Sequence, residues 1–211
     1  MARASTPPRG TMRRALTLPT PSSTVLYVCD VQERFRPLIW RFPALVASVR
    51  TLCRAAALLD VRTVVTEQNP ARLGATVAEV AGALPPAARV FSNMKFSMVT
   101  EELARHAAQP EHAILCGIEA HVCVQQTALE LLRAGTQVHL VVDAVSSQRQ
   151  GDRAVALANL VAAGAAVTTT EAVVFQLLGD AAHPRFKDVQ RVVIEHNDAA
   201  RALAPNLDCL A

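Results

Sequence analysis

The sequence predicts a Rossmann-like, three-layer α/β/α protein with a six-stranded parallel sheet. Apolar strand-like runs alternate with helix-like runs along most of the 211 residues, and this alternation is typical of a parallel sheet covered by helices on both faces. Several strand-like runs are apolar at consecutive positions, as burial on both faces requires. Hydrophobic residues make up 51% of the chain and aromatic residues only 4%, so we expect a core of mostly Ala, Val and Leu.

The strands are predicted wherever short apolar runs occur, and the helices wherever longer periodic runs lie between them. In chain order, the expected strands are 24–31, 61–67, 89–93, 113–116, 137–143 and 165–170. The expected helices are 43–59, 99–107, 122–134, 152–163, 171–178 and 184–202. No internal repeat or interdomain linker interrupts this order, which predicts one domain over 24–211.

Cys123 is the first candidate for chemistry, because it lies where the predicted helix 122–134 begins. That helix has apolar residues at a 3.6-residue spacing and is terminated by Gly135. The unpaired N–H groups at a helix start favour a thiolate over a thiol and are suited to holding a developing oxyanion. The alternative is that Cys123 is a small apolar residue of the core.

Asp30 is the second candidate, and it stands near the end of the first apolar strand. In open α/β sheets, ligands bind at the carboxyl ends of the strands. A carboxylate and a thiol at the ends of neighbouring parallel strands would converge on one crevice and place a base beside a nucleophile. The alternative is that Asp30 only forms a turn or caps a helix.

Lys95 is a candidate cation. Only Lys95 and Lys187 among the 21 basic residues are lysine, and a lysine kept in a chain so rich in arginine indicates that a compact ammonium is needed. The alternative is a solvated surface lysine.

Five motifs together resemble the isochorismatase-like hydrolase superfamily, a group of cysteine hydrolases that includes nicotinamidases. The resemblance is closest to the isochorismatase-domain-containing branch and extends from about Thr24 to Ile194. The matching segments are Cys-Asp-Val-Gln-Glu-Arg-Phe at 29–35, Thr-Glu-Gln-Asn-Pro at 66–70, Phe-Ser-Met-Val at 96–99, Cys-Gly-Ile-Glu-Ala-His-Val-Cys at 116–123 and Gly-Asp-Ala-Ala-His-Pro-Arg-Phe-Lys at 179–187.

The resemblance implies that Asp30 takes the thiol proton and that Cys123 attacks a carbonyl or similar electrophilic carbon. The lysine of the family falls on Asn93. Lys95 lies two positions later, and residues two apart share a face of an extended strand. We therefore expect Lys95 to substitute for the family lysine if the segment stays extended.

No metal or other cofactor is expected. Nicotinamidases bind zinc through Asp and His residues after the second strand, whereas residues 66–72 here contain no histidine. The six histidines of the chain show none of the usual metal-ligand spacings. The absence of zinc ligands also argues against nicotinamide as a substrate.

Further residues are predicted to shape the pocket. The resemblance implies a cis peptide bond, with Glu119–Ala120 as the candidate, that aims backbone N–H groups at the oxyanion. His121, beside it, is more simply a solvated histidine at a helix start. The other predicted pocket residues are Phe35, Glu67, Gln68 and Phe96, and Asp143 is expected to be a structural turn residue.

Three functions remain open from the sequence. The first is metal-free cysteine hydrolysis of an amide or related small-molecule carbonyl. The second is isochorismatase-type cleavage of a vinyl ether, for which an acid suffices and Cys123 is not needed. The third is a catalytically inactive scaffold, which Asn93 at the family lysine position favours. Some members of this branch are called ribonucleases, but no residue here supports that activity.

Charge and cysteine content limit the partners and the compartment. The net charge is +3, but Arg3, Arg9, Arg13 and Arg14 lie in a leader without acidic residues, which leaves −1 for the rest. We therefore expect no nucleic-acid partner, and no apolar run is long enough to span a membrane. Five cysteines without paired spacing suit a reducing compartment.

The segment 1–23 is predicted to be a disordered or loosely packed leader. Its composition partly fits a mitochondrial transit peptide, so the expected location is cytoplasmic, or mitochondrial if the leader is a targeting signal. The family commonly forms homo-oligomers, and we expect association through helices near Trp40 or through the C-terminal region.

Overall fold

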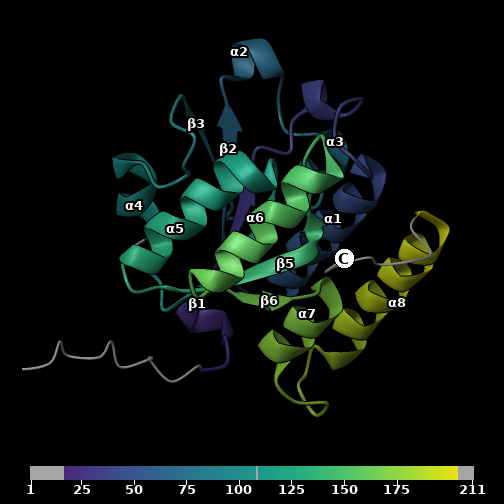
Figure 1. Cartoon of the computed structure of the whole chain (residues 1–211). Coiled ribbons are helices and arrows are strands. Elements are labelled where there is room, and N and C mark those ends of the chain that lie inside the picture. The colour runs from purple at the N-terminus through teal and green to yellow at the C-terminus, as the bar shows by residue number, and fades with distance from the viewer. Residues whose placement is uncertain (1–16, 108, 204–211) are drawn as a thin grey trace, which may run out of the picture.

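Six parallel strands form one sheet whose order reverses in the middle. The computed structural model describes residues 17–107 and 109–203. The strand order is β3-β2-β1-β4-β5-β6, and every neighbouring pair is parallel. This arrangement confirms the predicted three-layer α/β/α class (Figure 1). Because the chain winds outward from β1 in one direction and from β4 in the other, the switch point of the sheet lies between these two strands.

The strands and helices lie close to the predicted ranges. The strands are β1 Thr24–Cys29, β2 Arg62–Gln68, β3 Arg89–Asn93, β4 His112–Gly117, β5 Gln137–Val145 and β6 Ala166–Thr168. The helices are α1 Phe42–Leu58, α2 Pro70–Leu73, α3 Ala78–Ala81, α4 Glu101–Ala107, α5 Gln125–Arg133, α6 Gln150–Ala162, α7 Thr170–Leu178 and α8 Phe186–Leu203. The two shortest helices, α2 and α3, were not predicted, because four residues are too few to show a helical period.

Strand β5 is longer than predicted, so Asp143 lies inside the strand and not at its end. A register shift after Leu115 lets pairing resume between Gly117 and Val145. The Asp143 carboxylate accepts the backbone N–H of Thr170 at 2.8 Å and lies 3.7 Å from the imidazole of buried His196. Asp143 therefore has a structural role at the start of α7.

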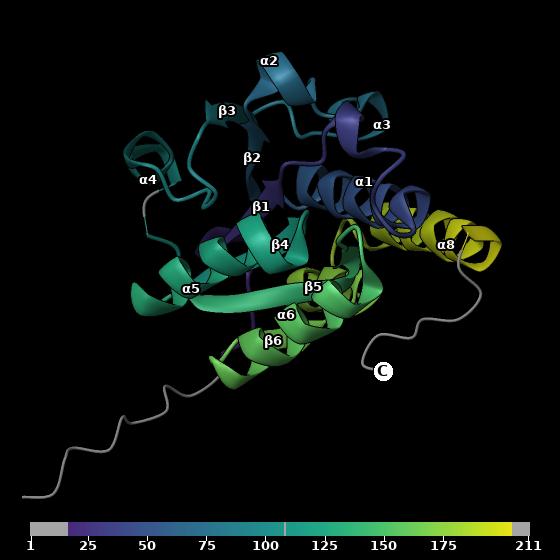
Figure 2. The same cartoon turned by 45° about the horizontal axis from the view of Figure 1, so that its top comes forward.

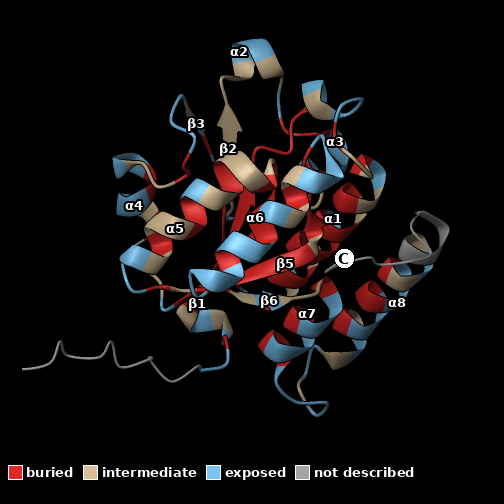
Figure 3. Ribbon diagram, viewed as in Figure 1, coloured by how far each residue is buried: buried red, intermediate tan, exposed pale blue. Residues whose placement is uncertain are grey.

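Two apolar cores lie on opposite faces of the sheet. Helices α1, α7 and α8 pack on one face and α4, α5 and α6 on the other (Figures 1 and 2). Alternate residues of β1 point to opposite faces, with Leu26 and Val28 in the first core and Val25 and Tyr27 in the second. The central strands β1 and β4 are accordingly buried at every residue, whereas the edge strands β3 and β6 are partly exposed. The outer sides of the helices are exposed (Figure 3).

Gly117 lets the ends of β1 and β4 approach closely. It pairs with Cys29 in the parallel register and has a φ of 114°, which L side chains rarely adopt. A Cβ atom there would lie 2.0 Å from the carbonyl oxygen of Cys29. The absence of a side chain at Gly117 therefore allows the end of β4 to pack directly against the end of β1.

Most of the predicted leader, residues 1–16, lies outside the described residues. Of the remainder, Thr17 lies against the sheet, since its hydroxyl is 3.1 Å from Nε2 of His112 and its N–H donates to the Gln137 side chain at 3.3 Å. Among the described helices, none combines the length and apolarity needed to cross a membrane.

Candidate active site

Asp30 and Cys123 meet at the switch point of the sheet. The donor atoms of Cys29, Asp30 and Cys123 all lie within 4.8 Å of one another. The Cys29 thiol donates to the Asp30 carboxylate at 3.5 Å, and Cys123 also hydrogen-bonds to that carboxylate. The exposed fractions are 0% for Cys29, 3% for Asp30 and 7% for Cys123. The structure therefore brings together the predicted base and nucleophile, with a second thiol beside them.

The backbone of Asp30 turns sharply out of β1. Its φ is 51°, a left-handed conformation that costs a non-glycine residue about 1–3 kcal/mol. Its N–H donates to the Thr66 carbonyl at 3.2 Å, and the Thr66 hydroxyl donates to the carboxylate at 2.7 Å. Thr66, on β2, thus holds the carboxylate in place.

Burial raises the pKa of Asp30 above its ordinary value. Hydrogen bonds from Thr66, Cys123 and Cys29 act in the opposite direction, because they stabilise the carboxylate, but they do not cancel the effect of burial. The pKa of Cys29 is raised well above its ordinary value, first by burial and then by its hydrogen bond with Cys123 and the nearby Asp30 charge. Cys29 is therefore a neutral thiol, and Asp30 is a stronger base than an exposed aspartate.

Cys123 lies in a π-helical turn, Ala120–Val124, that leads into α5. The helical segment thus begins two residues before the predicted start. The Cys123 carbonyl accepts the Thr127 hydroxyl at 2.7 Å, and the Thr127 hydroxyl accepts the N–H of Met98 at 2.9 Å. These bonds fix the turn to the loop after β3.

The cis peptide bond lies at Ile118–Glu119, so the prediction of Glu119–Ala120 is wrong by one residue. The resemblance located the bend, but the register of the bend depends on its backbone pairing. Ile118 donates to the carbonyl of Cys29 at 2.9 Å, and Ala120 donates to that of Ser146 at 2.8 Å.

The structure does not bring Lys95 to Asp30 and Cys123, so the proposed substitution for the family lysine needs correction. Strand β3 ends at Asn93, and the bends that follow remove the extended geometry on which the prediction depended. The Lys95 ammonium donates to the Val99 carbonyl at 2.8 Å and to the Glu130 carboxylate at 2.9 Å. The Lys95 side chain is 47% exposed, as the surface-lysine alternative describes.

Asn93 and Gln68 lie side by side at the ends of β3 and β2. The side-chain oxygens of both residues are buried and have no hydrogen-bond partner among the described residues. The Gln68 side-chain amide donates to the carbonyl of Met94 at 3.0 Å. The two amide oxygens are therefore candidate acceptors for a bound molecule.

Of three other predicted pocket residues, two are engaged elsewhere and one is exposed. The Glu67 carboxylate accepts the N–H and the hydroxyl of Thr76 at 2.7 and 2.9 Å. Phe35 packs against the core on the α1 face, whereas Cys123 belongs to the core on the opposite face. Phe96 is 52% exposed. None of these contacts places the three side chains at Cys123.

Glu119 and His121 line a small cavity of about 160 Å³ with Gln148, Arg149 and Asp152. The Glu119 carboxylate accepts the N–H of Gln148 at 2.9 Å. His121 is not simply solvated, because its Nδ1 lies 3.0 Å from the Ser147 hydroxyl. The cavity is polar and adjoins the Cys123 turn.

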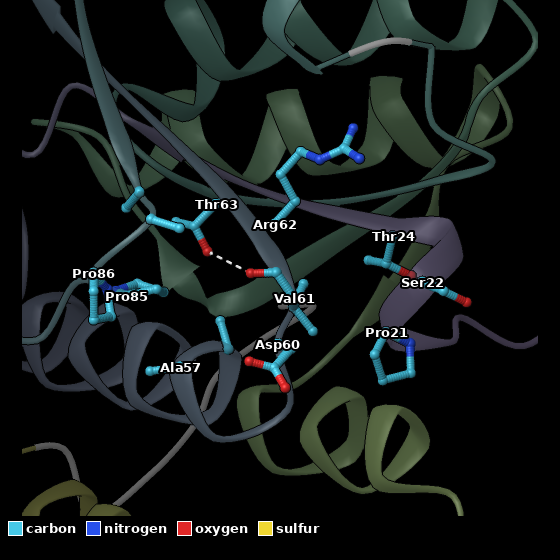
Figure 4. Close-up of a pocket in the computed structure, with 13 residues that line it drawn as sticks. Pro21, Ser22, Thr24, Ala57, Asp60, Val61, Arg62, Thr63, Pro85 and Pro86 are labelled. Carbon is cyan, nitrogen blue, oxygen red and sulfur yellow. Dashed lines mark hydrogen bonds between the residues drawn. The ribbon is translucent and has the colours of Figure 1, made fainter.

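A larger cavity, of about 510 Å³, lies at the opposite end of the sheet (Figure 4). Its lining comes from the start of β1, the α1–β2 turn and the segment before β3, and includes Thr24, Asp60, Arg62 and Pro85. The Arg62 guanidinium donates to the Ala107 carbonyl at 2.7 Å. The residues that line it include no cysteine and no histidine, so we assign the chemistry to the Asp30–Cys123 end.

Two places at the carboxyl end of the sheet are candidates for metal ligation, one after β1 and one after β2. The donor atoms of Cys29, Asp30 and Cys123 are close enough to meet one thiophilic ion. The zinc arrangement of nicotinamidases does not fit, because β2 ends at Gln68, no histidine follows it up to Arg72, and the Glu67 carboxylate accepts the N–H of Thr76. The expectation of metal-free chemistry stays a prediction.

Sequence reasoning missed three residues that support this site. Cys29 stands in an apolar run that is typical of inert core, and its position next to Asp30 was its one signal. Thr66 is wholly buried in an apolar strand, and its place in the matching segment 66–70 was its only signal. Gln32, also wholly buried, donates to the carbonyls of Gln68 and Gly74 at 3.0 and 2.6 Å, so it fixes the segment after β2.

Comparison with known proteins supports the same fold and motifs. The isochorismatase domain family matches residues 24–172. The chain belongs to the isochorismatase-like superfamily. It is 45% identical over 186 residues to isochorismatase domain-containing protein 2 of Bos taurus, covering 87% of this chain and 89% of that protein.

Two solved structures extend the comparison. The MAR1 ribonuclease of Caenorhabditis elegans superposes with a TM-score of 0.83 at 42% identity, covering 84% of this chain and 93% of that one. The YcaC gene product of Escherichia coli, described as an octameric hydrolase of unknown specificity, superposes with a TM-score of 0.73 at 20% identity, covering 88% and 98%. The second likeness shows the isochorismatase-like fold alone.

Proposed function

We propose that this isochorismatase-like protein is a cysteine hydrolase that acts on an amide or related carbonyl of a small molecule. The observation that carries the proposal is the contact between the Asp30 carboxylate and the Cys123 thiol at the switch point of the sheet. Burial raises the pKa of Asp30, and a more basic carboxylate takes a thiol proton more readily.

In the proposed mechanism, Asp30 accepts the proton of Cys123 and the sulfur attacks the carbonyl carbon. The N–H groups of Ala120, Val122 and Val124 already donate to the carbonyls of Ser146 and Glu119. We therefore assign the oxyanion contacts to the N–H groups of His121 and Cys123.

Asp30 then returns the proton to the leaving amine as the C–N bond breaks, which leaves a thioester on Cys123. In the second half, Asp30 takes a proton from water, the resulting hydroxide adds to the thioester, and the sulfur leaves. The proton on Asp30 restores the thiol. One water is consumed, and the amide is converted to an amine and a carboxylic acid.

Slow turnover is expected, because the two positions considered for a cation supply none to this pair. Asn93 is uncharged, and Lys95 is paired with Glu130. Without a nearby ammonium, stabilisation of the thiolate depends on the N–H groups of the turn and on Asp30.

The test is a panel of small amides and esters assayed with the wild type, Cys123→Ala and Asp30→Asn. Both variants should lose roughly 10²-fold or more in kcat/KM. Cys53→Ala is the matched control, because Cys53 is a buried cysteine in the other core. Equal rates in all four proteins would contradict the proposal and favour the inactive scaffold.

Vinyl-ether cleavage is the second candidate, and the raised pKa of Asp30 favours it because a protonated carboxyl is an acid catalyst. In that case Asp30→Asn should lose activity on a vinyl ether such as isochorismate, while Cys123→Ala keeps it. The C. elegans relative is named a ribonuclease, and the same two variants can be assayed on RNA. If both variants cleave RNA as fast as the wild type, the cleavage does not depend on Asp30 or Cys123.

We further propose that the protein forms a homo-oligomer, as the octameric YcaC does. Trp40, near which we expected association, is half-buried and has the guanidinium of Arg41 over its ring at 4.6 Å and that of Arg153 at 5.8 Å. Light scattering of the purified chain tests the proposal, since a monomeric mass would contradict it.

The cytoplasmic or mitochondrial location also stays a prediction.

A further inference from the structure

The four described cysteines fall into two groups that face opposite sides of the sheet. Cys53 and Cys116 lie in the core under α1, and Cys29 and Cys123 lie in the core under α5. The proposed hydrolysis uses only Cys123. Cys29 is therefore a second sulfur beside the nucleophile for which the hydrolytic mechanism has no use.

We propose that Cys29 and Cys123 form a reversible disulfide when a hydroperoxide oxidises Cys123. The two sulfur atoms lie within 4.8 Å of each other and within the same distance of the Asp30 carboxylate. A thiol that captures an oxidised neighbour must lie close to it, beside a base that accepts its proton, and out of reach of the oxidant itself. Cys29 meets these conditions, because it contacts Asp30 at 3.5 Å and is 0% exposed.

The exposures assign the order of the two steps. Cys123 is 7% exposed and Cys29 is 0% exposed, so a hydroperoxide reaches Cys123 first. The sulfur of Cys123 attacks the terminal peroxide oxygen, an S–O bond forms and the O–O bond breaks. The thiol proton passes through Asp30 to the departing alkoxide, which leaves as an alcohol. The product on Cys123 is a sulfenic acid.

In the second step, Asp30 accepts the proton of Cys29, and the Cys29 sulfur attacks the sulfur of Cys123. The S–S bond forms, the S–O bond breaks, and hydroxide leaves as water with the proton from Asp30. The two thiols together lose two electrons and two protons, and the hydroperoxide is reduced to an alcohol and water. Both steps use the same carboxylate, which hydrogen-bonds to both thiols.

The two sulfurs must move closer to bond, and the fold allows the movement at Cys123. Cys29 is the last residue of the buried strand β1 and is fixed by pairing with Gly117 on β4. Cys123 lies in a single π-helical turn, a local irregularity of the helix. A small shift of this turn closes the gap while the sheet stays unchanged.

The disulfide would remove the nucleophile reversibly and protect it from further oxidation. This consequence rests on the proposed function, whereas the bond itself does not. The inference is therefore tested by chemistry on the two sulfurs and not by hydrolytic activity.

The experiment treats the reduced full-length chain with a small excess of hydrogen peroxide in the presence of a chelator. Remaining thiols are alkylated in denaturant, and the unreduced protein is digested with trypsin and a glutamate-specific protease. Cleavage after Glu119 separates Cys116 from Cys123, so the linkage can be assigned by mass spectrometry. We expect a Cys29–Cys123 cross-linked peptide that dithiothreitol abolishes.

Two variants sharpen the test. In Cys29→Ala, the recovery of free Cys123 by dithiothreitol should be lost, because Cys123 proceeds to the sulfinic acid, which dithiothreitol does not reduce. Cys53→Ala should give the same cross-link as the wild type. If Cys29→Ala folds poorly, Cys29→Ser replaces it in this comparison. The mapping of the cross-linked peptide in the wild type depends on neither variant.

The inference is overturned if wild-type Cys123 becomes sulfinic acid as fast as it does in Cys29→Ala, if another cysteine pair such as Cys53–Cys116 forms the bond, or if no bond forms. A hydrolase that forms no cross-link would leave the proposed function standing. A protein that forms the cross-link but hydrolyses nothing would remove the proposed function alone.

Discussion

Each end of the sheet buries a pair of polar side chains in contact. Only the pair at the carboxyl end contains a thiol. At the carboxyl end, burial raises the pKa of Asp30 beside Cys123. At the amino end, Nδ1 of His112 lies 2.9 Å from Nε2 of His139, and burial together with His112 lowers the pKa of His139 to about 4. In both places burial favours the neutral form of the group.

The difference lies in what surrounds each pair. Asp30 and Cys123 lie where the strand order reverses and where a helical turn presents backbone N–H groups. The histidine pair is covered by Thr17, whose hydroxyl lies 3.1 Å from Nε2 of His112. A shifted pKa therefore marks burial in both cases, and a nucleophile with nearby donors is what distinguishes a candidate active site.

Gly117→Ala, at the carboxyl end of the sheet, should have the largest effect on the free energy of unfolding. A Cβ atom there would lie 2.0 Å from the Cys29 carbonyl oxygen, and the backbone is part of a rigid strand pair. We expect a loss of more than about 4 kcal/mol in the free energy of unfolding, measured by urea denaturation. Gly164→Ala is the control, because Gly164 has a φ of 104° but nothing within 4 Å of a Cβ, and it should cost only about 1–3 kcal/mol. Similar losses in the two variants would contradict the close-approach argument.

Asp30→Asn separates function from stability at the same end. The folded-state pKa of Asp30 is raised above its ordinary value of 3.8, so the unfolded state loses this proton more easily. Stability from this group is complete below about pH 3.8 and is lost as the pH rises through the folded-state pKa. The variant should therefore be inactive yet more stable than the wild type at neutral pH, by thermal unfolding. A variant less stable than the wild type at pH 7 but not at pH 3 would show that the carboxylate stabilises the fold.

His139→Gln tests the amino end, where the sign is reversed. The pKa of His139 is about 4 in the folded protein and about 6.5 when unperturbed, so the unfolded state binds more protons between these values. The wild type should lose about 2 kcal/mol of unfolding free energy as the pH falls from 6.5 to 4. The variant should lose less over this range, while His183→Gln, at a surface turn, should behave as the wild type. A wild-type profile that is flat over this range would refute the assignment.

The elements that the sequence predicted best are those whose burial alone determines them. Strands β1 and β4 are buried at every residue, and their continuous apolar runs showed this directly. The short helices α2 and α3 and the extension of β5 depend on backbone pairing with distant segments, which one sequence does not display.

The candidate site was also predictable only in part. Asp30 and Cys123 stand at strand ends, so parallel topology brings them together. Lys95 was misplaced because its direction depends on the bend after Asn93 and on Glu130, which lies 35 residues further along the chain. Thr66 was missed because a buried threonine in a strand is indistinguishable from its valine neighbours by pattern.

Asn93→Lys should give the smallest effect and sharpen the carboxyl-end comparison. Asn93 ends β3 and has a buried side-chain oxygen without a partner among the described residues. A lysine there would restore a cation at the family position and favour a thiolate at Cys123. The rate of Cys123 alkylation by iodoacetamide should rise, with its pH midpoint moved to lower pH. Met94→Lys adds the same charge at a neighbouring residue that is 71% exposed, so screening by solvent should leave its alkylation rate near that of the wild type. Equal acceleration in both variants would mean that the charge acts through the general field of the protein, and the position of Asn93 would then have no special relation to the thiol.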